Sequence, residues 1–226
     1  MSKSDAEYNN DLLQQLRLPY GASGVHVAAL MHESNANMTH TCFSCVDILP
    51  GDTLLEIGHG NGAHVPKFFE TVPHMRYQGL EVSWLMHHEA MKLNEASVAN
   101  GTARFKVYDG KKFPFNDQVF EKIITVNTLY FLSDLVMFLS ESYRTLKVGG
   151  KFGIAFASRE FMRSLSFIPP AFNLYEVEQV KRLISNAGFV DEIEINVHER
   201  SIMGNELTSS KLGREFSVIV ASKSHA

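Results

Sequence analysis

One stretch of the chain decides its fold, Thr53-Leu54-Leu55-Glu56-Ile57-Gly58-His59-Gly60-Asn61-Gly62-Ala63-His64. Residues 53–57 form a short, mainly apolar run without alternation, which is typical of a strand covered on both faces of a parallel sheet. The three glycines that follow permit positive φ angles and carry no Cβ atoms, so a ligand can lie directly on the backbone at the N-terminus of the next helix. The stretch therefore predicts a buried strand, a glycine-rich turn that cradles a nucleotide-type ligand, and a helix.

Further strand patterns follow this stretch. Residues 122–126 and 151–157 are two more apolar runs of the buried type. Residues 104–108 and 190–197 alternate between polar and apolar side chains, as strands do when one side is partly solvated. We therefore place these two strands at the edges of the sheet.

Helical spacing covers four segments between and before the strands, residues 5–17, 24–48, 133–148 and 175–187. In the third segment Ser133 is the expected cap, Leu146 lies on the apolar face, and Gly149 ends the helix together with Gly150. Alternating strands and helices predict an α/β fold, a Rossmann-like, doubly wound sheet with right-handed crossovers. We expect residues 1–50 to form an N-terminal helical cap and residues 51–226 to form one domain.

Composition and charge disfavour several classes of protein. Of the 226 residues, 45% are hydrophobic and 20% are charged, which is enough apolar material for a sizeable core. The 21 Lys and Arg and the 25 Asp and Glu give a net charge of −4 without a long run of one sign, which disfavours a nucleic-acid binder with a broad basic face. The first ten residues lack the apolar core of a signal peptide, and no apolar stretch reaches the roughly 18 to 20 residues that span a bilayer. We therefore expect a cytoplasmic protein.

The two cysteines, Cys42 and Cys45, form a C-x-x-C pair. Such a pair could be a redox couple or, with His40 and Asp47, half of a metal site; the simpler interpretation is two small residues on a packed helix. Zinc usually takes a second pair of soft ligands, and the histidines show no H-x-E or H-E-x-x-H spacing. We expect no metal.

The glycine pattern admits a second interpretation. Gly58-x-Gly60-x-x-Ala63 also fits the dinucleotide fingerprint of NAD-binding folds. Two features oppose it: Glu56 lies two residues before the first glycine, where a carboxylate would repel a pyrophosphate, and the chain shows no second domain to hold a hydride acceptor.

Further segments follow the glycine loop in a fixed order, namely Gly79-Leu80-Glu81-Val82-Ser83, Tyr108-Asp109-Gly110, Phe113-Pro114-Phe115-Asn116-Asp117, Asn127-Thr128-Leu129-Tyr130-Phe131 and Leu146-Lys147-Val148-Gly149-Gly150. In these segments, over roughly residues 50–190, the chain resembles the class I S-adenosylmethionine-dependent methyltransferases. Within that class it is most similar to the methyltransferase type 11 group, the small-molecule enzymes of the ubiquinone and menaquinone biosynthesis type. Glu121 replaces the usual Asp, and Val148 replaces the usual Pro.

The resemblance implies a seven-stranded sheet of order 3-2-1-4-5-7-6, in which strand 7, residues 214–222, is antiparallel. It also implies that S-adenosylmethionine is the cofactor. The loop would hold its amino-acid part, Glu81 would accept hydrogen bonds from both ribose hydroxyls, and Asp109 would bind the adenine amino group. The expected cofactor-binding residues are Glu56, Gly58, His59, Gly60, Gly62, Glu81, Val82, Asp109, Gly110, Asn127 and Thr128.

Methyl transfer from a sulfonium needs alignment of nucleophile, methyl group and sulfur, and it needs a base only where the acceptor requires one. The catalytic candidates are Tyr130, after the fourth strand, and His59 in the loop. Each has a plainer alternative, since Tyr130 could only pack and His59 could only be a spacer. Substrate contacts are expected from Tyr20, Asn37, His40, Tyr130, Phe167 and Phe172.

The apolar segment that contains Phe167 and Phe172 is either core or a lid over the acceptor. It favours a small, apolar or aromatic methyl acceptor. Two other functions stay open at this point: an NAD(P)-type oxidoreductase, and a protein that binds S-adenosylmethionine without catalysis. The atom that is methylated and the formation of a homodimer stay open too.

Overall fold

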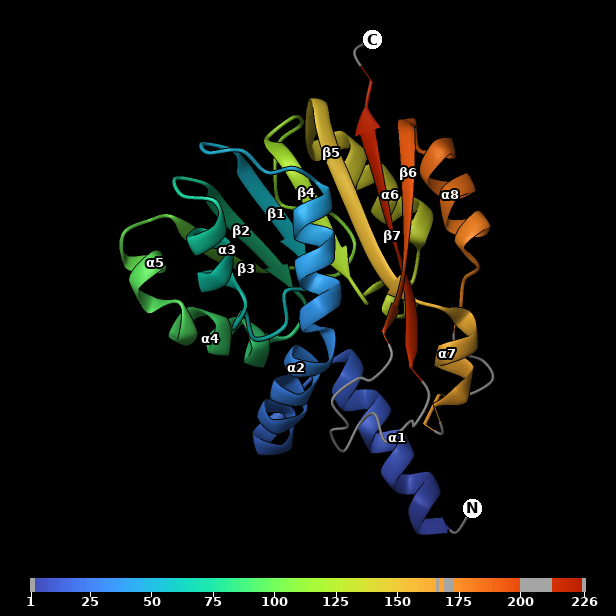
Figure 1. The fold of residues 1–226 in the computed structure, drawn as a ribbon. Coiled ribbons are helices and arrows are strands. Elements are labelled where there is room, and N and C mark those ends of the chain that lie inside the picture. The colour runs from blue at the N-terminus through green and yellow to red at the C-terminus, as the bar shows by residue number, and fades with distance from the viewer. Residues whose placement is uncertain (1–2, 166, 169–172, 200–212, 225–226) are drawn as a thin grey trace.

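The computed structural model describes residues 3–165, 167–168, 173–199 and 213–224, and its centre is a seven-stranded sheet of order β3-β2-β1-β4-β5-β7-β6 (Figure 1). The strands are β1 (Thr53–Ile57), β2 (Arg76–Glu81), β3 (Ala103–Val107), β4 (Phe120–Val126), β5 (Leu146–Ala157), β6 (Phe189–Glu199) and β7 (Arg214–Lys223). The pairs among β1 to β5 are parallel, whereas β7 runs antiparallel to both of its neighbours. The strand order, the antiparallel β7 and the edge positions of β3 and β6 confirm the expectations from the sequence.

Helices cover both faces of the sheet (Figure 1). They are α1 (Lys3–Arg17), α2 (Gly21–Cys45), α3 (Val65–Thr71), α4 (Trp84–Leu93), α5 (Glu95–Ala99), α6 (Leu135–Thr145), α7 (Arg159–Ser164) and α8 (Val177–Asn186), with one 3-10 turn, η1 (Leu129–Phe131). Successive β1 residues face opposite cores: Leu54 packs with side chains of α2, α3 and α4, and Leu55 packs with those of α6, α7 and α8. None of the helices within the described ranges combines the length and the apolar character of a membrane span.

The structure corrects the helix that was expected to start at Ser133. The cap of α6 is Asp134, whose Oδ1 accepts a 2.9 Å hydrogen bond from the Met137 amide. The helix ends at Thr145 because Leu146 already pairs with Phe120 at the start of β5. Gly149 lies inside this strand, with a φ of +73°, where the pairing with β4 is irregular. Strand pairing here outweighs a helical spacing of apolar residues.

Helix α2 lies directly on the sheet, and both cysteines belong to it. Cys42 is buried in the core and Cys45 is half-buried, and both thiols are free. Burial raises the pKa of each thiol, so neither favours the thiolate that redox chemistry or metal binding needs. Gly153 of β5 makes room for the helix, because a Cβ there would lie 2.6 Å from Val46 Cγ1 and 3.1 Å from Cys42 Sγ.

This close packing predicts that Gly153→Ala destabilises the protein by about 1–3 kcal/mol through overpacking. Urea denaturation of the variant measures the loss. The matched control is the same substitution in a Val46→Ala background, where the obstructing methyl group is absent and the cost of the added Cβ falls. An equal cost in both backgrounds would contradict the proposed contact.

Candidate functional site

A cavity of about 560 Å³ opens at the carboxyl ends of β1, β2, β3 and β4, a volume in the range of small-molecule sites. Strand β1 lies between β2 and β4, so the chain order reverses at this point of the sheet, where ligands bind in open α/β folds. The cavity wall is completed by the end of α1 and the turn before α2, by α2 itself and by Phe161, Met162, Leu165, Phe167 and Ile168.

The glycine loop leaves its backbone open to a ligand. Gly58 has a φ of +77°, and a Cβ on it would lie 2.1 Å from Thr128 Cγ2. Gly60 has a φ of +56°, and no heavy atom lies within 4 Å of the position of its absent Cβ. The Gly60 amide donates a 3.1 Å hydrogen bond to Glu81 Oε2. The loop is therefore held against the end of β2, and at Gly58 and Gly60 it presents backbone without a side chain to the cavity.

Glu81 ends β2 as a carboxyl group in the cavity wall with only 7% of the residue exposed. Its Oε1 accepts hydrogen bonds from the amides of Val82, at 2.8 Å, and Ser83, at 3.1 Å. Burial raises the pKa of this carboxyl, and the backbone amides oppose the rise. Three backbone donors thus fix the orientation of a carboxyl group that has about four acceptor sites, so about one site remains for a ribose hydroxyl.

Glu56 is held inside the protein. It is 2% exposed, and its Oε2 receives hydrogen bonds from Tyr77 Oη at 2.6 Å and from His64 Nε2 at 2.7 Å. Burial by itself raises the pKa of the carboxyl, but His64 and Tyr77 outweigh it and leave the pKa below its usual value. His64 also stacks on His32 of α2, with 5.9 Å between ring centroids. The first acid of the loop therefore joins the sheet to the covering helix.

The structure argues against His59 as a catalytic base. The residue is 3% exposed, and its ring centroid lies 5.0 Å from that of Phe105. The ring fits because residue 79 is glycine: a Cβ there would lie 2.5 Å from His59 Cδ2. Burial lowers the pKa of the imidazole to about 4, and neither ring nitrogen has a hydrogen-bond partner in the described part of the chain. His59 is a neutral ring packed beneath the loop.

The other catalytic candidate is Tyr130. It lines the cavity but is only 5% exposed, and its hydroxyl donates a 3.0 Å hydrogen bond to the carbonyl oxygen of Ala157. Burial raises the pKa of this hydroxyl, so the phenolate form that a base requires is disfavoured. Tyr130 contributes a ring to the wall of the site, which favours the packing interpretation.

Asp109 lies at the rim of the cavity after β3 and is exposed. Its Oδ1 accepts hydrogen bonds from the amides of Lys111, at 2.9 Å, and Lys112, at 3.3 Å. The pKa of the carboxyl is lowered chiefly by the bond from Lys111. The side chain therefore closes a turn, and the turn brings Tyr108 and Gly110 to the cavity.

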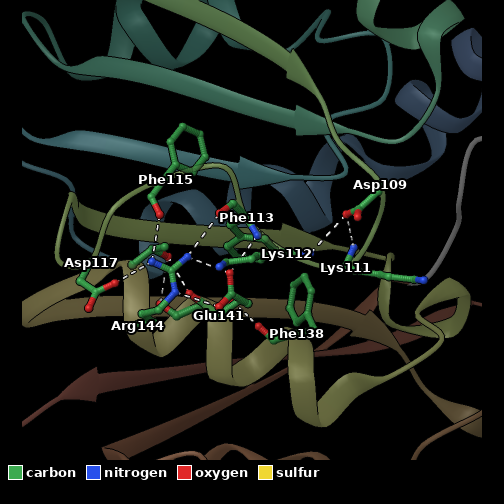
Figure 2. A network of polar contacts seen from close by, with 11 residues as sticks. Asp109, Lys111, Lys112, Phe113, Phe115, Asp117, Phe138, Glu141 and Arg144 are labelled. Carbon is green, nitrogen blue, oxygen red and sulfur yellow. Dashed lines mark hydrogen bonds and ion pairs between the residues drawn. The ribbon is translucent and has the colours of Figure 1, made fainter.

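The segment after this turn is clamped by two residues of α6 (Figure 2). Arg144 donates to the carbonyl oxygen of Phe115 at 2.9 Å, to that of Phe113 at 3.3 Å and to Asp117 Oδ1 at 2.7 Å. Glu141 holds the guanidinium through two hydrogen bonds of 2.8 Å and also accepts a 2.9 Å bond from the Phe113 amide. The rim that carries Asp109 is thus anchored to α6, which packs on the face of the sheet opposite to α2.

Three residues expected to contact a substrate do not line the cavity: Tyr20, Asn37 and His40. The Tyr20 hydroxyl donates to Asp11 Oδ1, Asn37 Nδ2 donates to Glu199 Oε1, and His40 is exposed. The part of α2 that faces the cavity carries other residues, Ala28, Met31, His32, Ser34, Asn35 and Thr39. Their spacing of three to four residues is a helical stripe, which the sequence contained but which its weak apolar contrast concealed.

The remaining expected site residues divide into three groups. Gly58, Gly60, Val82, Gly110, Asn127, Thr128 and Phe167 line the cavity. Gly62 does not line it, because its backbone packs against Ala90 of α4 and Asn94, the residue that caps the end of α4. Phe172 lies outside the described residues.

The sequence patterns do not indicate Arg214, a 2% exposed residue of β7 that reaches the cavity. Among the described residues, no group of three or more potential ligands could hold a metal ion.

The family model for a methyltransferase domain matches residues 55–154, from the first strand into the fifth. The match covers 100 of the 226 residues, and over this part the chain is similar to the class I S-adenosylmethionine-dependent methyltransferases. In Bacillus subtilis it is 27% identical to putative methyltransferase YrhH over 51% of this chain and 63% of that protein. It is also 27% identical to uncharacterized methyltransferase YdaC, over 58% and 70% of the two chains.

Solved structures share the fold at lower identity. Phosphoethanolamine N-methyltransferase 2 of Haemonchus contortus, in complex with phosphomonomethylethanolamine and S-adenosylhomocysteine, gives a TM-score of 0.74 at 17% identity, over 96% of this chain and 60% of that one. Geranyl diphosphate C-methyltransferase of Streptomyces coelicolor A3(2) gives 0.70 at 14% identity, over 91% and 87%. S-adenosylmethionine is the cofactor of this class of proteins.

The buried imidazole predicts acid sensitivity. The pKa of His59 is about 4 in the folded chain and near 6.5 in the unfolded chain, so the unfolded state binds more protons between these values. Stability should therefore fall as the pH drops from about 6.5 towards 4, by about 2–3 kcal/mol from this group. Urea midpoints across this pH range measure the fall, and His59→Leu should reduce it. An unchanged slope in His59→Leu would assign the acid sensitivity to other groups.

The clamp on the rim predicts that Arg144→Lys weakens the binding of S-adenosylhomocysteine roughly tenfold, because lysine keeps the charge but loses the planar fork that holds the rim. Isothermal titration calorimetry measures the change. Lys181→Met is the matched control, since it removes the 3.1 Å ion pair with Glu194 far from the cavity wall and should leave binding unchanged. Equal affinities for all three proteins would refute a role of the clamp in binding.

Proposed function

We propose that this chain transfers a methyl group from S-adenosylmethionine to a small, largely apolar acceptor. The observation that carries the proposal is the division of one cavity into two halves. The first half is formed by the bare glycine loop, Glu81 and the rim at Asp109. The second half is formed by apolar side chains, Phe131, Leu132, Phe161, Met162, Leu165, Phe167 and Ile168.

The residues of the first half fit the cofactor. The open backbone at Gly60 suits the amino-acid portion, the oriented carboxyl of Glu81 suits the ribose, and the turn at Asp109 suits the adenine. When bound, the cofactor supplies a methyl group on a positively charged sulfur, already activated for displacement. What this chain contributes is alignment of the two reactants and exclusion of water.

The covering elements perform the exclusion of water. The end of α1, with Leu16 and Arg17, and the turn that follows it, with Leu18 and Pro19, line the cavity. Ser83 Oγ, two residues beyond Glu81, donates a 2.9 Å hydrogen bond to the carbonyl oxygen of Pro19. The cover is thus attached to the same short segment that orients Glu81.

For an acceptor that must lose a proton, His32 is the best-placed base. It lies in the cavity wall on α2 and stacks on His64. Burial, followed by the neighbouring His64, lowers the pKa of its imidazole, so the ring is neutral near pH 7 and can accept a proton. His59 and Tyr130 are less suitable because their titrating groups are buried.

The acceptor is proposed to be a small molecule rather than a nucleic acid, and the site of action the cytoplasm. The net charge of −4 and the apolar half of the cavity support a small molecule. Two of the structural relatives are named for small acceptors, phosphoethanolamine and geranyl diphosphate.

Calorimetry separates the methyltransferase from an NAD-dependent oxidoreductase. We expect S-adenosylmethionine and S-adenosylhomocysteine to bind in the roughly micromolar range and NAD not to bind. Glu81→Ala should weaken binding roughly 10- to 100-fold, since a hydrogen bond to a charged group is lost. Glu70→Gln, at an exposed ion pair with Lys67, is the matched control. Binding of NAD without S-adenosylhomocysteine would sink the proposal.

Transfer of labelled methyl groups to a panel of apolar small molecules tests catalysis itself. We expect turnover of at least one panel member that has a nucleophilic oxygen, nitrogen, carbon or sulfur. Tight binding of the cofactor with no transfer to any member would favour the alternative of a non-catalytic binding protein.

A further inference from the structure

A buried arginine reaches the acceptor half of the cavity from β7. Arg214 is 2% exposed, and its Nε donates a 2.6 Å hydrogen bond to Glu199 Oε2 on the neighbouring strand β6. Its Nη2 donates a 2.7 Å hydrogen bond to the carbonyl oxygen of Ser34 in α2. The positive charge is matched by Glu199, so this part of the wall carries polar groups without a net charge.

The side-chain amide of Asn35 receives two donors at this point. Its Oδ1 accepts hydrogen bonds from Asn127 Nδ2 at 2.7 Å and from Arg214 Nη1 at 3.4 Å. The guanidinium can only donate, which requires the oxygen of Asn35 to face it. The Asn127 amide is oriented in the same way, because its Oδ1 accepts a 3.3 Å bond from the Ala157 backbone amide and its Nδ2 must then point to Asn35.

This orientation leaves the other end of the Asn35 amide for the cavity. Asn35 lines the cavity and is half-buried. Within the described ranges of the chain, Asn35 Nδ2 has no hydrogen-bond acceptor. The atom is accessible and not fully buried. The nitrogen is therefore an oriented donor in a wall that is otherwise largely apolar, as in specific small-molecule sites.

The donor belongs to the acceptor half. Asn127, Ala157 and Arg214 lie at the carboxyl ends of β4 and β5 and at the start of β7. The loop, Glu81 and Asp109 lie at the ends of β1, β2 and β3, on the other side of the sheet's switch point. A ligand group that meets Asn35 Nδ2 is thus expected on the methyl acceptor.

We propose that Asn35 determines specificity, and that its Nδ2 donates a hydrogen bond to a carbonyl oxygen of an otherwise apolar acceptor. The inference rests on the proposed methyltransferase function and narrows its substrate class. A neutral carbonyl fits better than an anion because Glu199 already balances the charge of Arg214. A hydroxyl group fits less well, since its proton would find no acceptor at Nδ2.

The test compares two probes of the same shape, acetophenone and 1-phenylethanol, which differ in a carbonyl oxygen and a hydroxyl. Their affinities are measured by ligand-observed NMR on the full chain saturated with S-adenosylhomocysteine. The unmodified protein should bind the ketone roughly tenfold more tightly than the alcohol. Asn35→Asp should reverse this preference, because a carboxylate accepts from the hydroxyl and repels the carbonyl, and Asn35→Leu should abolish it.

Asn186→Asp, at an exposed position of α8 outside the cavity wall, is the matched control and should keep the ketone preference. S-adenosylhomocysteine should bind all four proteins, which shows that the variants are folded and separates this inference from the proposed function. A protein that binds S-adenosylhomocysteine but shows no preference between the probes, or whose preference survives in Asn35→Asp, overturns the inference. Failure of S-adenosylhomocysteine to bind the unmodified protein overturns the proposed function instead.

Discussion

The buried carboxylate of Glu56 is the constraint on which the site depends. A charge with 2% exposure is tolerated only if it is paired and hydrogen-bonded, and here Tyr77 from β2 and His64 from the start of α3 provide both partners. To return His64 to the end of β1, the chain must turn sharply, which the glycines at 58 and 60 allow through positive φ angles. The open loop is thus the consequence of satisfying a charge inside the sheet.

The same constraint ties helix α2 to the sheet. His64 stacks on His32, so the pairing of Glu56 extends into α2. Further along the helix, Met38 and Phe43 belong to the hydrophobic core, whereas His32 and Asn35 line the cavity. One continuous helix therefore serves as core element and as cavity wall. A change in its packing on β5 will shift the residues that face a ligand, so stability and ligand binding are coupled in this fold.

Local patterns explain why the fold was predictable and part of the site was not. The strand and glycines of residues 53–62 and the alternation in β3 and β6 each depend on neighbours in sequence, and the structure has them as expected. By contrast, α2 shows no single apolar stripe, since one half faces a cavity and the other a core. The sequence therefore does not distinguish Asn37 from Asn35, which is the residue that faces the site. Arg214 contacts Ser34, 180 positions away, a contact that no local pattern encodes.

The distribution of hydrogen bonds in the cavity wall indicates how such a site promotes a reaction. The carboxylates of Glu56 and Glu81, the hydroxyl of Tyr130 and the guanidinium of Arg214 all have partners within the protein. Groups that are paired in this way are rigid and cost little reorganisation when a ligand binds, but they are poor proton carriers. A wall of this kind suits a displacement on a cofactor that is already activated, because fixing the reactants in line lowers the barrier.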